Sequence, residues 1–125
     1  MTSADELPEL PGIDIADGLK RVMHKVSLYQ KVLHDFHARF HNATTLIRNA
    51  LAAGDFDTAR RQAHSTKGLA GTIGALKLQD LARDLEEVLS TGQMPDEALF
   101  GRFDAELATV IDGIGQGFGI ARPAS

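Results

Sequence analysis

The sequence predicts an all-α protein, an antiparallel up-down four-helix bundle with a short additional N-terminal helix. Apolar residues recur at steps of three and four along four long segments, which is the spacing of an amphipathic helix. Glycine, proline and helix-capping residues separate these segments by short connections. No stretch shows sustained alternation with a period of two, the pattern of a half-buried strand. Amphipathic helices joined by short connections bury their apolar faces by packing antiparallel.

The first half of the chain contains a polar segment and two predicted helices. Residues 1–12 are expected to form an N-terminal tail or linker, because they are polar and contain two prolines. A short amphipathic helix is predicted from Asp14 to about Met23. Ser27 is the expected N-cap of a long helix that reaches about Ala53. The apolar stripe of this long helix is formed by Tyr29, Leu33, Phe36, Phe40, Ala43, Ile47 and Ala50 or Leu51.

The second half contains three more predicted helices. Gly54 ends the long helix and Asp55 caps the next one, which ends near Gly74. The buried side of that helix is formed by Phe56, Ala59, Ala63, Thr66, Ala70 and Ile73. A further helix is expected from about Lys77 to Leu89, and a last helix follows Pro95 and extends to Ile114.

The glycines near the C-terminus predict a flexible tail over residues 116–125, so the bundle is expected to occupy residues 13–115. Their spacing is that of a flexible exit and not that of a phosphate-binding loop that follows a strand.

Composition limits the classes of function. The 125 residues carry a net charge of -4, which argues against general nucleic-acid binding. The chain has no cysteine and therefore no disulfide or thiolate chemistry. Neither a signal peptide nor an apolar run of membrane-spanning length is present, so we expect a cytoplasmic protein with no membrane insertion. We also expect a monomer.

Three residues of the predicted helix after Gly54 form the strongest candidate site. His64, Lys67 and Gly68 lie three and four positions apart, so a helix places them on one face. At 100° per residue, the apolar stripe of this helix centres roughly 135° away from His64, which therefore faces solvent. The three residues supply a nitrogen nucleophile, a cation and an absence of bulk. This combination suits a histidine that carries a phosphoryl group and presents it to another protein.

Neighbouring residues are expected to support this patch. Gly71 falls close to the line of His64, and Gly68 and Gly71 each cost about 1 kcal/mol relative to alanine inside a helix. Close approach of another protein would compensate for that cost. Arg60 and Arg61 would add a basic rim that complements an acidic partner.

The chemistry of imidazole fits the interpretation that His64 carries a phosphoryl group. An imidazole with an ordinary pKa near 6.5 is mostly neutral at pH 7, which leaves one ring nitrogen free to attack phosphorus. Lys67 would balance the charge that builds up on the phosphoryl oxygens during transfer.

The motif resembles that of histidine-containing phosphotransfer (HPt) domains, in which H-x-x-K-G precedes an apolar residue and a glycine. The matching residues are His64-Ser65-Thr66-Lys67-Gly68 and Ile73-Gly74. The N-terminal Leu10-Pro11-Gly12-Ile13-Asp14, with Gly18-Leu19 and Leu28-Tyr29, is similar to the start of HPt domains attached to hybrid sensor kinases, and Leu81 to Leu85-Glu86 matches the fourth-helix pattern. The resemblance covers about residues 10–115.

This resemblance implies a module that accepts a phosphoryl group from the aspartate of a response-regulator receiver domain and donates it to another receiver. By that likeness His64 is the phosphorylation site, Lys67 its charge-balancing neighbour and Gly68 the residue that leaves access. The implied partners are receivers and a hybrid sensor histidine kinase. The domain itself is expected to bind no cofactor, because the receiver supplies Mg²⁺. Docking is expected around Leu69, Ile15 and Leu19.

The sequence departs from the family pattern at two positions near the motif. Thr66 stands where the family usually has an apolar residue, and its hydroxyl is expected to bond back to the carbonyl of Gln62. Glu86 stands where some members have a glutamine that supports the histidine. A carboxylate there would act on the protonation of the imidazole.

Two other functions are weighed against phosphotransfer. His34, His37 and His41 fall nearly on one line of a helix, and imidazoles at this spacing bind zinc, copper or nickel. The same residues also fit a polar flank beside the core. The second alternative is an adaptor that docks receivers without transfer. Because no Walker loop accompanies the bundle, an autonomous ATP-dependent kinase is not expected.

Overall fold

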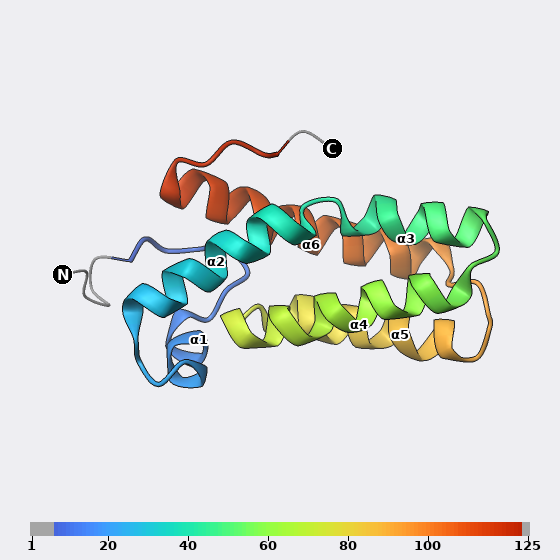
Figure 1. The fold of residues 1–125 in the computed structure, drawn as a ribbon, viewed down its shortest axis with the longest axis horizontal. Helices are drawn as coiled ribbons and strands as arrows, with labels where there is room; N and C mark the ends of the chain where they lie inside the picture. The colour runs from blue at the N-terminus through green and yellow to red at the C-terminus, as the bar shows by residue number, and fades with distance from the viewer. Residues whose placement is uncertain (1–6, 124–125) are drawn as a thin grey trace.

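The computed structural model describes residues 7–123, and within this range the chain is helical, without a strand (Figure 1). The predicted all-α class is therefore confirmed. The helices are α1 (Ile15–Arg21), α2 (Val26–Phe40), α3 (Ala43–Ala52), α4 (Phe56–Ile73), α5 (Leu76–Ser90) and α6 (Glu97–Phe118). None of the helices in this part of the chain is long and apolar enough to cross a membrane.

The helices form a bundle in which α2 and α3 together act as one long member. They lie beside α6 along one side, and α4 and α5 run antiparallel along the other (Figure 1). Helix α1 lies at one end, where Asp14 N–H donates to the carbonyl of Gly74 at 2.8 Å. The buried core is built from the predicted stripes, with large side chains such as Tyr29, Phe36 and Phe103 at its centre. The short N-terminal helix is thus fixed to the C-terminal end of α4.

The long helix predicted from Ser27 to Ala53 is wrong in one respect, because the chain forms two helices with a break at His41 and Asn42. Asn42 leaves the helical region with φ -111° and ψ 23°, as asparagine does readily because its side chain competes for backbone hydrogen bonds. The apolar spacing continues through the break, since both helices bury the same side, so periodicity alone does not reveal it. Ser27 also lies inside α2, whose N-cap position is Lys25.

The predicted caps around α4 are confirmed. The Asp55 side chain accepts the Thr58 N–H at 3.0 Å at the start of the helix. Gly74 ends it in the left-handed region with φ 87°. A Cβ at Gly74 would collide with the carbonyl of Asp14, so this position also serves the docking of α1. Asp96 caps α6 through the Leu99 N–H at 2.7 Å.

The predicted flexible C-terminal tail is wrong at its start, since α6 continues to Phe118. The glycines of this part allow close packing of other segments. A Cβ at Gly113 would lie 2.7 Å from the Pro11 ring, and one at Gly117 would lie 2.8 Å from the Leu10 side chain. Leu10 is 5% exposed, so the predicted N-terminal tail packs against α6 over its described residues. Residues 1–6, 124 and 125 of the two predicted tails lie outside the described residues.

Candidate functional site

His64 lies in the middle of α4 on the side that faces away from the core. Its side chain is 62% exposed, whereas Ala63 and Thr66 are fully buried. The Thr66 hydroxyl donates to the Gln62 carbonyl at 2.8 Å, as predicted. The hydroxyl of Thr66 is therefore hydrogen-bonded within its own helix. The nearby His64, by contrast, is exposed to solvent.

Glu86 of α5 connects His64 and Lys67 through its two carboxylate oxygens. Its Oε2 lies 2.6 Å from His64 Nδ1, and its Oε1 accepts from Lys67 Nζ, also at 2.6 Å. The Glu86 side chain is only 17% exposed, and charge-assisted hydrogen bonds of this kind are short and strong. The carboxylate thus fixes one edge of the imidazole against the seam between α4 and α5.

The protonation state of Glu86 follows from its surroundings. Partial burial raises the pKa of its carboxyl, but the hydrogen bonds from Lys67 and His64 outweigh that effect and hold the pKa below its ordinary value. Glu86 is therefore ionised at neutral pH and can only accept hydrogen bonds. Nδ1 of His64 must then carry a proton, so in the neutral ring Nε2 is the nitrogen with the free lone pair.

Lys67 does not stand free beside the histidine. Its ammonium group is paired with Glu86, and its side chain is 26% exposed. The helical period predicts that Lys67 shares a face with His64, but it does not predict this pairing. The partners belong to different helices, 19 residues apart, and only the register of α4 against α5 brings them together.

The two glycines of the predicted patch differ in their surroundings. A Cβ at Gly68 would meet nothing within 4 Å, so the surface beside His64 is open there. Gly71, expected on the same exposed line, is instead buried, and a Cβ there would collide with the Gln79 side-chain amide. The expectation that Gly71 leaves room for a partner is therefore wrong, because the space above it is occupied by a residue of α5.

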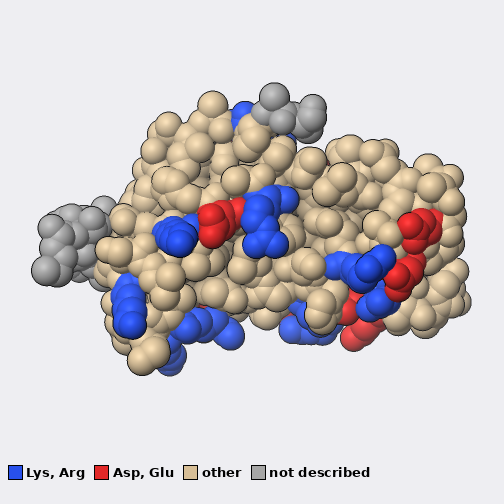
Figure 2. All heavy atoms as spheres, in the orientation of Figure 1, with Lys and Arg blue, Asp and Glu red and all other residues tan. Residues whose placement is uncertain are grey.

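Arg60 and Arg61 lie one turn before His64, as predicted, but both are bound to the same carboxylate. Asp57 accepts from Arg60 at 3.0 Å and pairs with Arg61 at 3.1 Å. Figure 2 shows that Lys and Arg side chains lie beside Asp and Glu over the first half of α4 and over α2. Over α1 and the turn after it, the visible charged side chains are Lys and Arg. The predicted basic rim is thus partly neutralised by its neighbours.

The residues expected to dock a partner are not equally accessible. Ile15 and Leu69 are half-buried and keep part of their apolar surface exposed. Leu19 is 6% exposed and belongs to the core. It faces the bundle because α1 packs against α4, so the expectation that Leu19 contributes to docking is wrong.

The three histidines of α2 do not converge on a metal site. His34 packs against the Phe118 ring with centroids 5.2 Å apart, and His41 Nδ1 lies 3.1 Å from the Ala38 carbonyl. His37 is buried with 2% exposure. Within residues 7–123 no group of three or more histidine, cysteine or acidic residues is arranged to hold a metal ion.

Comparisons with known proteins agree with the helical fold. A crystal structure of the HPt domain from a sensor hybrid histidine kinase of Shewanella superposes with a TM-score of 0.76 and covers 86% of this chain and 94% of its own. Its sequence identity is 20%, so this likeness concerns the fold alone. No curated protein matches the chain. The family model of the Hpt domain, a histidine phosphotransfer module of phosphorelays, matches residues 31–114. Because this match covers more than half of the sequence, the chain belongs to the Hpt domain family.

Proposed function

We propose that Nε2 of His64 accepts a phosphoryl group from the aspartyl phosphate of a receiver domain and passes it to a second receiver. The observation that carries this proposal is the hydrogen bond between Glu86 and Nδ1 of His64. It assigns the proton to the nitrogen that faces α5 and leaves the other nitrogen as the nucleophile. The 62% exposure of the side chain gives a partner access to the ring.

The transfer needs no proton acceptor, because Nε2 carries no proton when it attacks phosphorus. The Nε2 lone pair forms a P–N bond while the bond between phosphorus and the aspartate oxygen breaks, and the aspartate leaves as a carboxylate. Nδ1 keeps its proton throughout and continues to donate it in the hydrogen bond to the Glu86 carboxylate. As positive charge develops on the ring, the ionised carboxylate of Glu86 stabilises it. The reverse sequence returns the phosphoryl group to another receiver.

Lys67 and Gly68 support the step in different ways. The Lys67 ammonium holds Glu86 in place and lies one turn from His64, so it is within reach of the phosphoryl oxygens if it exchanges partners. The open surface at Gly68 lets the donor domain approach the imidazole. Arg60 and Arg61 add positive charge before His64, although each is paired with Asp57.

The partners are receiver domains, including that of a hybrid sensor histidine kinase, and the chain acts as a transfer module and not as an autonomous kinase. The exposed parts of Ile15 and Leu69 would contact the receiver around His64. The receiver supplies the Mg²⁺ that neutralises phosphoryl charge, so this domain needs no cofactor of its own. A monomer offers one such surface to successive partners.

The test mixes the chain with a receiver that carries radiolabelled phosphate on its aspartate. The expected result is an acid-labile, base-stable label on the wild type and on His34→Gln, and none on His64→Gln. Equal labelling of all three proteins contradicts the proposal. Binding of the receiver without any label would instead support an adaptor. An activity that is lost when His37 and His41 are substituted but is kept in His64→Gln would support metal binding.

A further inference from the structure

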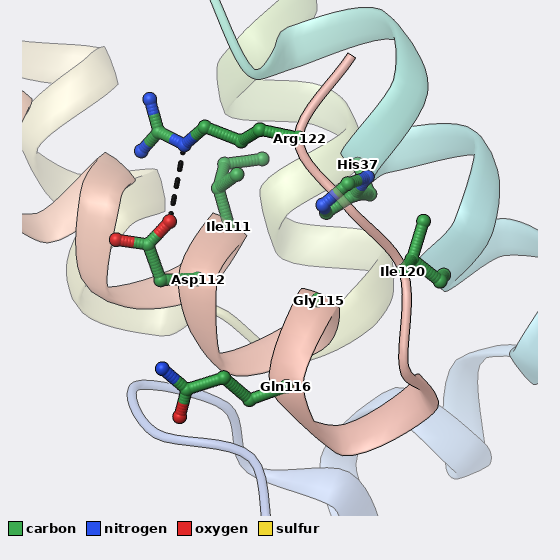
Figure 3. Close-up of a pocket in the computed structure, with 7 residues that line it drawn as sticks. All are labelled: His37, Ile111, Asp112, Gly115, Gln116, Ile120 and Arg122. Atoms are coloured by element: carbon green, nitrogen blue, oxygen red, sulfur yellow. Dashed lines mark hydrogen bonds and ion pairs between the residues drawn. The ribbon is translucent and has the colours of Figure 1, made fainter.

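A cavity of about 280 Å³ lies at the end of the bundle where the chain turns back after α6 (Figure 3). One wall is α6, with Ile111, Asp112, Gly115 and Gln116, and another is His37 of α2. Residues 119–123 pass over the top and contribute Ile120 and Arg122. The cavity is separate from His64 and has no part in the proposed phosphoryl transfer.

His37 is the unusual residue of this cavity. It is 2% exposed, and its Nε2 has no hydrogen-bond partner among the described residues. Burying a polar atom without a hydrogen-bond partner is unfavourable. Gly115 makes this burial feasible, since a Cβ there would lie 3.2 Å from His37 Nε2 and 2.8 Å from the Ile120 carbonyl oxygen.

The charged and titratable groups around His37 oppose its protonation in this position. Burial lowers the pKa of His37, and the nearby His41, Arg122 and His34 lower it further, while Asp112 raises it. These groups come from all three elements around the ring: His34 and His41 from α2, Asp112 from α6 and Arg122 from residues 119–123. The ring is therefore neutral while it is covered.

The covering segment is held by few interactions. Gly119 turns the chain in the left-handed region with φ 66°, and the Ile120 N–H donates to the Gly115 carbonyl at 2.7 Å. The Arg122 Nε donates to Asp112 at 3.0 Å, with side chains that are 47% and 54% exposed. Exposed ion pairs of this kind contribute little to stability. Few interactions therefore hold residues 119–123 over His37.

We propose that residues 119–123 are a strap that opens when His37 takes up a proton. A charged imidazole repels the Arg122 guanidinium and attracts the Asp112 carboxylate, so it weakens the one ion pair that anchors the strap. The charged imidazole also needs a water molecule as a hydrogen-bond partner at Nε2. The adjacent cavity has room for several water molecules, which can reach the ring once the strap opens. The released segment would expose the apolar surface of Ile111 and Ile120 below pH 6.5.

The direction follows from linkage. The pKa of His37 is lower in the covered form than in the open form, so the open form binds more protons. The opening equilibrium is therefore independent of pH well above the ordinary histidine pKa of about 6.5 and increases as the pH falls below it. The opening equilibrium should rise by up to about tenfold for each pH unit in that range.

Amide hydrogen exchange by NMR tests this device on the full chain. The protection factor of the Ile120 amide, corrected for the intrinsic exchange rate, is measured between pH 7.5 and 5.0 relative to a core amide such as that of Ala63. The expected ratio falls as the pH decreases below 6.5, by up to about tenfold per unit, in the wild type and in His24→Gln, an exposed control. It should stay constant in His37→Gln.

A constant ratio in the wild type, or the same fall in His37→Gln, overturns the proposal. A parallel loss of protection at Ile120 and Ala63 also overturns it, because the whole domain would then be opening. If His37→Gln fails to fold, the ring nitrogens of His37 are titrated directly in the wild type by NMR. A His37 pKa at or above 6.5 would contradict a covered, neutral imidazole.

Discussion

The carboxylate of Glu86 lies 2.6 Å from Nδ1 of His64 and 2.6 Å from Nζ of Lys67, so one acidic residue orients the histidine and neutralises the lysine. Glu86 differs from the glutamine that some HPt domains have at this position. The geometry shows that a carboxylate performs the same acceptor function toward Nδ1 and adds a full negative charge. This relationship leads to the first two predictions.

Glu86→Gln should slow phosphoryl transfer by about tenfold without preventing it. The amide oxygen can still accept from Nδ1, but a charge-assisted bond is roughly twice as strong as a neutral one, and a loss of about 1.4 kcal/mol in the transition state is tenfold in rate. Glu86→Ala, which removes the acceptor, should be slower still. Rates of label transfer from a receiver measure the effect, and ring-nitrogen NMR shifts report the tautomer. An unchanged rate in Glu86→Ala would show that the tautomer is fixed by something else.

Lys67→Met should slow transfer at least tenfold and lower the free energy of unfolding by roughly 1–2 kcal/mol, because the mostly covered Glu86 carboxylate loses one charge-assisted partner and keeps the other. The thioether side chain keeps most of the apolar stem packed between α4 and α5, while the charge is lost. Urea unfolding gives the stability, and label transfer gives the rate. A matched variant, Lys20→Met on the exposed face of α1, should change neither. A large loss of stability in Lys67→Met would mean that the ion pair is chiefly structural.

Gly68→Ala and Gly18→Ala should change stability in opposite directions. The methyl group at Gly68 meets nothing within 4 Å, so the better helix propensity of alanine should raise the free energy of unfolding by up to about 1 kcal/mol. At Gly18 the Cβ would lie 2.5 Å from the Ile73 carbonyl oxygen and would strike the Tyr29 ring, which should cost roughly 2–3 kcal/mol. Thermal unfolding distinguishes the two.

The same glycine tests access to the histidine. Gly68→Leu should fold as well as Gly68→Ala, because leucine is also a good helix former. It should nevertheless transfer phosphoryl groups at least tenfold more slowly than Gly68→Ala, since its side chain covers the open surface beside His64. Equal rates in the two variants would show that the partner does not approach over Gly68.

The sequence predicts much of this fold because the relevant signals are local. The caps at Asp55 and Gly74 follow from residue chemistry at the ends of a periodic segment, and the outward direction of His64 follows from the helical period alone. The break at Asn42 is missed because the stripe from Phe40 to Ile47 keeps its spacing through it. The terminal glycines are misread because glycine marks flexible chain and close packing alike, and only the approach of Pro11 to Gly113 distinguishes them.

The site is predicted less completely for a related reason. His64, Lys67 and Gly68 share a face of one helix, which the sequence specifies. The bond to Glu86 and the burial of Gly71 under Gln79 depend on the register of α5 against α4, which is set by packing across the whole seam. The burial of His37 beneath residues 119–123 depends on where the chain returns after α6. Such contacts between distant segments carry no periodic signal.

Tyr29→Phe should destabilise the bundle by roughly 1–2 kcal/mol and make its stability less sensitive to high pH. The fully buried Tyr29 hydroxyl donates to the Ile73 carbonyl at 2.8 Å and so connects α2 to the end of α4. Its removal leaves that carbonyl without this partner. Burial, with smaller effects from the nearby Asp14 and Asp17, raises the pKa of Tyr29 well above its usual range.

The sign of the pH effect follows from that raised pKa. The unfolded tyrosine loses its proton near pH 10 while the folded one keeps it. Tyr29 therefore contributes stability that is fully present below pH 10 and is lost as the pH rises above it, by up to about 1.4 kcal/mol per pH unit. Urea unfolding between pH 8 and 11 should show a steeper decline for the wild type than for Tyr29→Phe. Parallel declines would mean that the Tyr29 hydroxyl is not held in its buried bond to Ile73.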